Sequence, residues 1–382
     1  MLEKRIIQCY DFSGYNYGGA QMKLGFGLMR LPRKGIVIDI PQTCEMVDLF
    51  LDAGGTYFDT AYIYPGSEDA IRKALCERHP RESYTLATKL NAGIALTEKL
   101  AKTQLATSLK RTGAGYIDYY LLHTIMEKNV QRYEKFDLWD FVREEKEAGR
   151  IRHYGFSFHG TPPLLEKLLQ EHPDAEFVQL QINYCDWEDE KVCSREIYEI
   201  ARRYGKPIVV MEPVKGGRLA DPPENVRQLL TQADPNASFA SWAIRFAASL
   251  DGVMSVLSGM SNVEQMKDNL SYMRDFKPLN DAERELMRKA AEAFHAVKSI
   301  PCTGCGYCVK GCPKGIPIPE IFAARNEQLL YGRFEAGAQM YRDAVADKAC
   351  AADCIACGGC ERACPQHIEI IDTLKSCANT FK

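Results

Sequence analysis

Apolar positions between residues 20 and 297 alternate between two patterns. Short runs rich in apolar and β-branched residues predict strands. Between them, apolar residues recur at helical intervals. The predicted strands cover residues 23–28, 56–60, 84–89, 117–123, 153–157, 177–182, 207–213 and 253–258. Eight strand–helix units in about 250 residues are typical of an α/β protein with a closed (β/α)8 barrel, also called a TIM barrel.

Local signals mark where the helices of this pattern begin and end. Gly54 and Gly55 follow one helical stretch and are expected to end it. Ser67 and Ser238 each precede another and are expected to cap it. No G-x-G-x-x-G follows the first strand, which disfavours an open dinucleotide-binding sheet. A last helix is predicted over residues 281–297.

The composition changes after that helix. The chain has 382 residues and fifteen cysteines, ten of which lie after residue 301. Cysteines clustered at short spacing indicate metal binding rather than disulfides in a reducing compartment. We therefore predict two domains, a barrel over residues 1–297 and a ferredoxin-like, α-helical and loop-rich domain over residues 298–382.

Charge and hydropathy exclude several classes of partner. The net charge of −3 gives no reason to expect nucleic acid or an anionic membrane. The N-terminal segment, residues 1–14, has no apolar core of the kind that signal peptides carry. No apolar run reaches the roughly 18 residues that a membrane span needs. The expected compartment is the cytoplasm.

Four reactive side chains lie at or just after predicted strand ends. Asp59, Lys89 and His123 end consecutive strands, and Tyr64 follows Asp59 by five residues. The active site of a parallel barrel lies at these ends. Hydride addition to a carbonyl leaves charge on oxygen, which a tyrosine can protonate. We expect Asp59 to hold Lys89, Lys89 to lower the tyrosine pKa, and His123 to orient the carbonyl.

Several motifs in order resemble the aldo/keto reductase superfamily over roughly residues 20–275. They are D-T-A-x-x-Y with a following Ser-Glu, "ATK", "IDYYLLH", "GRIRHYGFSFH", "QINY" and "GMSNVEQ". The resemblance implies a (β/α)8 barrel that interconverts carbonyl and alcohol groups of a small-molecule substrate with NADP or NAD. By that resemblance Asp59, Tyr64, Lys89 and His123 form the catalytic tetrad, with Tyr64 as the general acid.

The same resemblance supplies candidate cofactor contacts. Ser157 and Gln181 match positions that hold the nicotinamide carboxamide, and Met211 stands where many members stack an aromatic ring. The segment after the last strand resembles the adenosine end of the site. It offers Gly259, Ser261, Gln265 and Asn269. Many NADP-dependent members place Arg at the position of Gln265, so the choice between NADP and NAD stays open.

The tail contains two copies of C-x2-C-x2-C-x3-C-P, the bacterial ferredoxin spacing for [4Fe–4S] clusters. Zinc ribbons lack the third cysteine and the C-P pair. Because the fourth cysteine of each motif ligates the other cluster in such ferredoxins, we predict two crossed ligand sets. They are Cys302, Cys305, Cys308 and Cys364 for one cluster, and Cys312, Cys354, Cys357 and Cys360 for the other. The remaining cysteines (Cys9, Cys44, Cys76, Cys185, Cys193, Cys350 and Cys377) are interpreted as ordinary thiols.

The sequence leaves the role of the clusters open among three hypotheses. They exchange electrons with a ferredoxin or another electron-transfer protein, they stabilise the tail and shape the pocket, or they sense redox state. We favour electron transfer, because two neighbouring clusters form a relay. The alternative function is a redox-sensing, nucleotide-binding regulator. The substrate is not identified, but the loop of residues 124–138, Tyr62 and Trp187 are candidates for the pocket that selects it.

Overall fold

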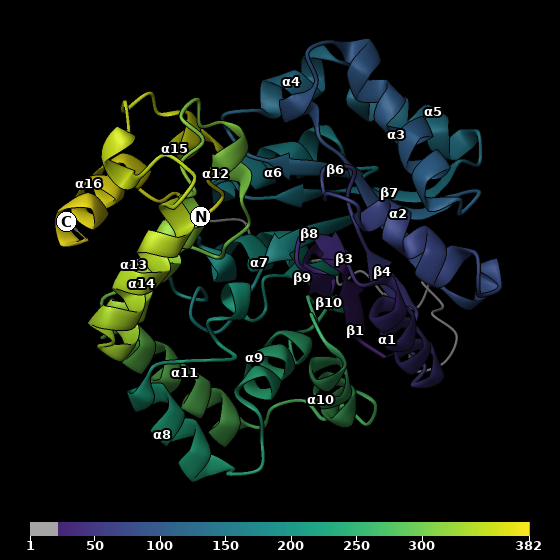
Figure 1. The fold of residues 1–382 in the computed structure, drawn as a ribbon. Coiled ribbons are helices and arrows are strands. Elements are labelled where there is room, and N and C mark those ends of the chain that lie inside the picture. Colours follow the sequence, from purple (N-terminus) through teal and green to yellow (C-terminus); the bar gives the residue numbers. More distant parts are fainter. Residues whose placement is uncertain (1–21, 382) are drawn as a thin grey trace, which may run out of the picture.

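The structure, a computed structural model, describes residues 22–381 (Figure 1). Eight parallel strands close into a barrel in the order β1-β10-β9-β8-β7-β6-β5-β4. They are β1 (Leu24–Gly27), β4 (Tyr57–Asp59), β5 (Thr85–Leu90), β6 (Ile117–Ile125), β7 (Ile151–Phe158), β8 (Phe177–Gln181), β9 (Ile208–Met211) and β10 (Val253–Ser258). The predicted barrel is thus confirmed. Cys9 and the N-terminal segment without an apolar core lie outside the described residues.

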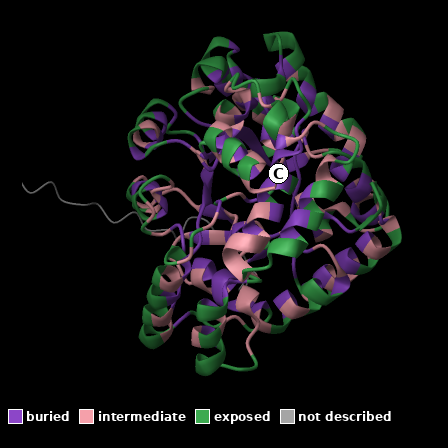
Figure 2. Ribbon diagram, turned by 60° about the vertical axis from the view of Figure 1, so that its left-hand side comes forward, coloured by how far each residue is buried: buried purple, intermediate pink, exposed green. Residues whose placement is uncertain are grey.

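Helices surround the barrel, and a small antiparallel hairpin of β2 (Arg33–Lys34) and β3 (Val37–Ile38) follows its first strand. The barrel helices are α1 (Ile40–Asp52), α2 (Ser67–Ile71), α3 (Glu98–Thr112), α4 (Val130–Lys135), α5 (Leu138–Glu147), α6 (Pro162–Glu171), α7 (Ser194–Arg203), α8 (Glu224–Ala233), α9 (Phe239–Ala248), α10 (Val263–Met273) and α11 (Asp281–His295). Figure 2 shows buried residues concentrated in the interior and exposed residues on the outer helices.

The inside of the barrel is filled by side chains and is not a pore. Inward-facing residues of several strands pack together there: Tyr57, Ala87, Tyr119, Leu121, Phe177, Val209 and Leu257. Residues of the opposite strand face, such as Phe58 and Leu86, belong to a larger core that includes the surrounding helices. Strand side chains alternate between these two cores, as the period of two requires. The filled interior leaves the carboxyl ends of the strands as the place for a site.

The two predicted serine caps have different outcomes. Ser238 accepts a hydrogen bond from the Ser241 amide at 3.1 Å and caps α9, as expected. Ser67 does not cap α2, because it is the first residue inside the helix and Gly66 precedes it in the left-handed region. The buried Ser67 hydroxyl instead donates to the Leu28 carbonyl oxygen at 3.0 Å and ties the helix to the end of β1.

The tail has its own core. Its helices are α12 (Tyr307–Lys310), α13 (Ile318–Tyr331), α14 (Phe334–Val345), α15 (Gly359–Ala363) and α16 (Ile370–Thr380). The stretch between the cysteine motifs is helical, as predicted, and Gly332 at φ 67° divides it into α13 and α14. Ile321, Phe322 and Leu374 form the centre of this core. In Figure 1 the tail, coloured light green to yellow, lies against one side of the barrel.

The tail backbone passes very close to the loop after β9. Gly216 adopts φ +68°, and a Cβ at this position would lie 2.5 Å from the Thr303 carbonyl oxygen. The Arg30 guanidinium donates to the same oxygen at 2.6 Å. Lys310 donates to the Ile63 carbonyl oxygen at 3.2 Å. The tail therefore packs on the carboxyl ends of the strands. No helix of residues 22–381 is long and apolar enough to cross a membrane.

Candidate functional site

Asp59 and Lys89 form a buried ion pair at the ends of neighbouring strands. The Lys89 Nζ lies 2.5 Å from Asp59 Oδ1 and 2.7 Å from the Thr60 carbonyl oxygen. Lys89 is fully buried and Asp59 nearly so. Burial raises the pKa of Asp59 and lowers the pKa of Lys89, because both charges have lost water. Their mutual attraction opposes both shifts and holds the ammonium at the strand end.

Tyr64 and His123 complete the predicted group of four. The Lys89 ammonium lies 5.4 Å from the centre of the Tyr64 ring, and the rings of Tyr64 and His123 are 5.8 Å apart. Burial, together with the charge of Lys89, holds the pKa of His123 well below its usual value. His123 is therefore a neutral imidazole at neutral pH. The structure thus brings all four side chains together at one end of the barrel.

The predicted lowering of the Tyr64 pKa is wrong. The pKa of Tyr64 is raised well above its usual value, first by burial and then by Tyr307 and Asp59. Asp59 offsets the charge of Lys89, so the ammonium does not leave a free positive field at the phenol. Tyr64 is consequently a protonated phenol at neutral pH, which is the form that can donate a proton.

Tyr307 of the tail is a member of this site that the sequence did not predict. Its hydroxyl lies 3.3 Å from His123 Nε2, and its hydrogen bond to Tyr64 contributes to the raised pKa of Tyr64. The only sequence signal is an aromatic residue between Cys305 and Cys308, which says nothing about contact with the barrel. Tyr307 places the tail inside the candidate active site.

A cavity of about 850 Å³ opens in front of these residues. Asp59, Tyr64 and His123 line one part of it, and Tyr307 and Cys305 line it from the tail. The predicted cofactor residues that line it are Met211, Gly259, Ser261, Gln265 and Asn269. The cavity thus joins the four catalytic candidates to the start of α10, where Asn262 caps the helix.

Four charged residues that line the cavity were not predicted as site residues: Arg30, Glu212, Glu264 and Asp268. Arg30 follows β1, and its guanidinium lies 4.0 Å from the Glu212 carboxylate. An added Cβ on Gly259 would lie 3.8 Å from Arg30 atoms, so the arginine is near the predicted adenosine end. Burial raises the pKa of Glu212, which also has a left-handed backbone with φ 56°. Arg30 is therefore a cation within reach of an anionic cofactor.

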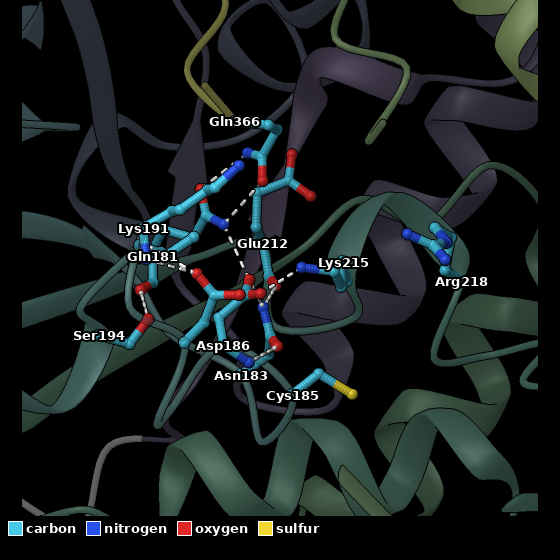
Figure 3. Close-up of polar contacts among 12 residues, drawn as sticks. Gln181, Asn183, Cys185, Asp186, Lys191, Ser194, Glu212, Lys215, Arg218 and Gln366 are labelled. Atoms are coloured by element: carbon cyan, nitrogen blue, oxygen red, sulfur yellow. Dashed lines mark hydrogen bonds and ion pairs between the residues drawn. The ribbon is translucent and has the colours of Figure 1, made fainter. Parts of the chain in front are cut away.

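Ser157 and Gln181 are not among the residues that line the cavity. The Ser157 hydroxyl accepts a hydrogen bond from the Thr124 amide at 2.7 Å. Thr124 has φ 59°, so this contact holds the bend directly after His123. Gln181 is paired with Gln366 of the tail through two amide hydrogen bonds of 2.8 and 3.0 Å (Figure 3). Their roles toward a cofactor stay predictions.

A buried polar network supports this glutamine pair (Figure 3). Gln181 also donates to Asp186 Oδ2 at 2.8 Å, and Asn183 donates to the same oxygen at 2.6 Å. Lys215 forms an ion pair with Asp186. Burial alone would raise the pKa of Asp186, but the Lys215 ammonium and these donors hold it below its usual value. The network fixes the end of β8 against the loop after β9.

The cysteines of each predicted set surround one cavity. Cys302, Cys305, Cys308 and Cys364 line the first, and Cys312, Cys354, Cys357 and Cys360 line the second. Within residues 22–381, no group of three or more His, Cys, Asp or Glu is close enough to hold a single metal ion. Thiols spread around a cavity fit a cubane cluster, whose irons are bound separately, better than a zinc ion.

The other pocket candidates lie elsewhere. The Arg111 guanidinium lies over the Tyr62 ring, 4.7 Å from the centre of that ring. Trp187 packs against Tyr198 and Phe246. Neither lines the cavity in front of His123. Cys377 is buried in the tail core, as an ordinary thiol would be.

Comparison with known proteins agrees with this architecture. Residues 23–292 match the model of the aldo/keto reductase family, and residues 301–369 match that of the 4Fe-4S dicluster domain. The chain is 30% identical over 210 residues to the aldo-keto reductase str7 of Strobilurus tenacellus, covering 52% of this chain and 59% of that protein. It is 22% identical to the NADH-specific methylglyoxal reductase of Escherichia coli, over 74% of this chain and 82% of that protein.

Solved structures share the barrel. The holo form of the aldo-keto reductase AKR11C1 from Bacillus halodurans superposes with a TM-score of 0.59 at 26% identity, covering 71% of this chain and 92% of that one. An aldo-keto reductase from Klebsiella pneumoniae in complex with NADPH shares the fold with a TM-score of 0.56 at 17% identity, covering 70% and 90%. The chain belongs to the aldo/keto reductase family of NAD(P)-dependent oxidoreductases and carries a 4Fe-4S dicluster domain at its C-terminal end.

Proposed function

We propose that this protein interconverts carbonyl and alcohol groups of a small molecule with NAD(P), and that two [4Fe–4S] clusters in its tail exchange electrons with a separate electron-transfer protein. The observation that supports the reductase activity is that Asp59, Tyr64 and His123 line one cavity that extends to the start of α10, and that Lys89 is paired with Asp59 directly behind it.

The residues divide the work of carbonyl reduction among them. The bound nicotinamide supplies the hydride to the carbonyl carbon. The protonated Tyr64 phenol donates its proton to the carbonyl oxygen as charge develops there. The neutral His123 imidazole and the Tyr307 hydroxyl hydrogen-bond and orient that oxygen. Lys89, held by Asp59, lies 5.4 Å from the centre of the Tyr64 ring and packs beside the phenol, which takes up a new proton from solvent after each turnover.

Residues of the same cavity are suited to hold the nucleotide. Met211 lines this cavity and would contact the nicotinamide, and Gly259, Ser261, Gln265 and Asn269 line it as well and would hold the adenosine part. The Arg30 guanidinium supplies positive charge for its phosphates, near the amino terminus of α10.

Turnover on a panel of aldehydes, with Tyr64→Phe as the variant, tests the reductase activity. We expect Tyr64→Phe to lose turnover and to keep nucleotide binding, because it removes only the proton donor. A redox-sensing regulator, the alternative function, would bind NAD(P)H tightly and show no turnover in either form. If the wild-type protein and Tyr64→Phe are equally inert while both bind nucleotide, the reductase proposal fails.

The position of the two cysteine sets supports the electron-transfer part. Cys305 lines both the first cysteine cavity and the catalytic cavity. In the second set, Cys357 is exposed at the surface. Two clusters bound there would run from the catalytic cavity toward the solvent. One cubane normally accepts one electron, so two clusters would take the two electrons of a hydride in two steps, and its proton would pass to solvent.

Anaerobic addition of NADPH or NADH, with dithionite as the positive control, tests this second part. We expect the visible absorption of the clusters to bleach with nucleotide, because the first cluster borders the catalytic cavity. If only dithionite bleaches the clusters, with or without substrate, the nucleotide does not exchange electrons with them, and a structural or redox-sensing role is left. The crossed ligand sets are tested separately, since Cys364→Ala should remove the first cluster and Cys312→Ala the second.

A further inference from the structure

A second cavity lies on the other side of Tyr307. This cleft, of about 740 Å³, runs between the loops that follow β5 and β6 and the tail helices α12 and α15. Tyr307 lines both the cleft and the catalytic cavity, so the two cavities meet at this residue. A ligand in the cleft would lie next to His123, because the Tyr307 hydroxyl is 3.3 Å from His123 Nε2.

The cleft is lined by positive charge. Five cationic residues face it: Lys128, Arg132, Lys135, Lys310 and Arg362. The residues that line it include no Asp or Glu. Among residues 22–381, none of the five forms an ion pair, and four of them donate only to backbone carbonyl oxygens. Charges of one sign in a concave surface reinforce each other and attract anions.

Three of these cations belong to the barrel rather than to the cluster motifs. Lys310 and Arg362 each lie two residues from cysteines of the predicted cluster sets, so they also face the negative charge of bound clusters. Lys128, Arg132 and Lys135 lie on the segment after His123 and on α4. Lys135 is exposed and lines the cleft, so its charge is free for a ligand.

Apolar side chains also line the cleft. Ile63, Met126 and Phe136 contribute apolar surface, and Ile94 and Leu96 at its edge are 50% and 88% exposed. A cleft with cations and apolar walls fits a ligand with an anionic group on an apolar body.

We propose that this cleft binds the carboxylate or phosphate group of the carbonyl substrate, so that the enzyme reduces anionic carbonyl compounds with an apolar body. The substrate carbonyl lies at Tyr64 and His123, and its anionic end reaches past Tyr307 to the cations of the cleft. This inference rests on the proposed reductase function and names its substrate class.

A pair of aldehydes of nearly equal shape tests the inference. 4-Carboxybenzaldehyde carries the anion, and methyl 4-formylbenzoate is its neutral ester. We expect the wild-type protein to prefer the acid by about tenfold or more in kcat/KM, as charge-assisted hydrogen bonds imply. Lys135→Gln should lower the ratio of acid to ester about tenfold, mainly through KM. Lys348→Gln, which removes an exposed charge of the tail outside the cleft, should keep the wild-type ratio.

Calorimetric binding of benzoate and of inorganic phosphate gives a readout that does not need turnover. We expect both anions to bind, and to bind about tenfold more weakly to Lys135→Gln. Equal kcat/KM for acid and ester, with anion binding independent of Lys135, would overturn the inference and leave the reductase function intact. If neither aldehyde is turned over but anion binding still depends on Lys135, the reductase function is overturned instead. That result would establish an anion site alone.

Two other results would also overturn the inference. An acidic ferredoxin that binds in a Lys135-dependent manner, while benzoate and phosphate do not bind, would make the cleft a protein-docking surface. If Lys135→Gln lowers kcat/KM for acid and ester alike and changes the visible spectrum of the clusters, its charge serves the clusters rather than the substrate.

Discussion

Removal of one hydroxyl from the tail tests whether the two domains share an active site. Tyr307→Phe keeps the ring that lines both cavities and deletes the oxygen 3.3 Å from His123 Nε2. The histidine is buried, so its ring nitrogen loses a partner that water does not easily replace. Leaving a buried polar group unpaired costs about 1–3 kcal/mol, which corresponds to roughly 5- to 100-fold in rate if the bond orients the carbonyl in the transition state.

The same variant also changes the proton donor. After burial, the hydroxyl of Tyr307 contributes to the raised pKa of Tyr64, in part through the hydrogen bond between the two phenols. Without the hydroxyl, the Tyr64 pKa should fall. Reduction needs the protonated phenol, so activity is lost as the pH rises through the Tyr64 pKa. The alkaline limb of the kcat/KM profile for carbonyl reduction should therefore move to lower pH in Tyr307→Phe.

The assay is steady-state carbonyl reduction as a function of pH, with iron content and the visible spectrum recorded for each sample. Tyr198→Phe is the matched control, because Tyr198 lies on α7 outside the cavity and its hydroxyl donates to the Asp251 carbonyl oxygen at 2.9 Å. We expect the control to retain wild-type kinetics. Wild-type kcat/KM and an unmoved alkaline limb in Tyr307→Phe, with intact clusters, would refute the role of the tail in catalysis.

Three further changes follow from the same geometry. Gly216→Ala should lower the free energy of unfolding by about 1–3 kcal/mol in denaturant titration, because the new Cβ meets the Thr303 carbonyl. Gly217→Ala is the control, since Gly217 also has a positive φ of +98° but no atom near the new Cβ. An equal loss of stability in both variants would show that the clash with Thr303 is not the cause. Gln265→Arg should raise the NADPH-to-NADH ratio of kcat/KM about tenfold, and an unchanged ratio would place the 2′-phosphate elsewhere. Lys215→Met should cost about 3–5 kcal/mol, because Asp186 is left buried and unpaired, and Asp186→Asn in the same chain should restore part of that loss. The Asp186 pKa is lowered in the folded state, so its stabilisation is present above the ordinary value of 3.8 and disappears as the pH falls through the folded value.

The strand ends were predictable because the pattern that predicts them is local. Each apolar run fixes where a strand stops, and a parallel barrel brings all such stops to one face. Asp59 and Lys89 therefore meet without any knowledge of long-range contacts. The cysteine sets were predictable for a related reason, since their spacing reflects the shape of the cluster rather than of the chain.

The missed features all depend on how the tail docks. Tyr307 meets His123 across 184 positions, and Gln366 meets Gln181 across 185. Neither contact can be predicted from the local pattern of apolar and polar residues. The error about the Tyr64 pKa has the same origin, because burial and Tyr307 are its leading causes. Without the tail, the Tyr64 phenol would be more exposed to water, and the charge of Lys89 would have a larger effect on its pKa.

The tail and the barrel both contribute residues to the cavity that contains Tyr64 and His123. Thr303, Cys305, Pro365 and Gln366 line the catalytic cavity on one side and the first cysteine cavity on the other. Tyr307 is carried between two cysteines of that set. A cluster bound there would fix the loop that positions the Tyr307 hydroxyl, whatever its electrons do. We therefore expect loss of the first cluster to lower carbonyl reduction through the position of Tyr307, whether or not the clusters carry electrons.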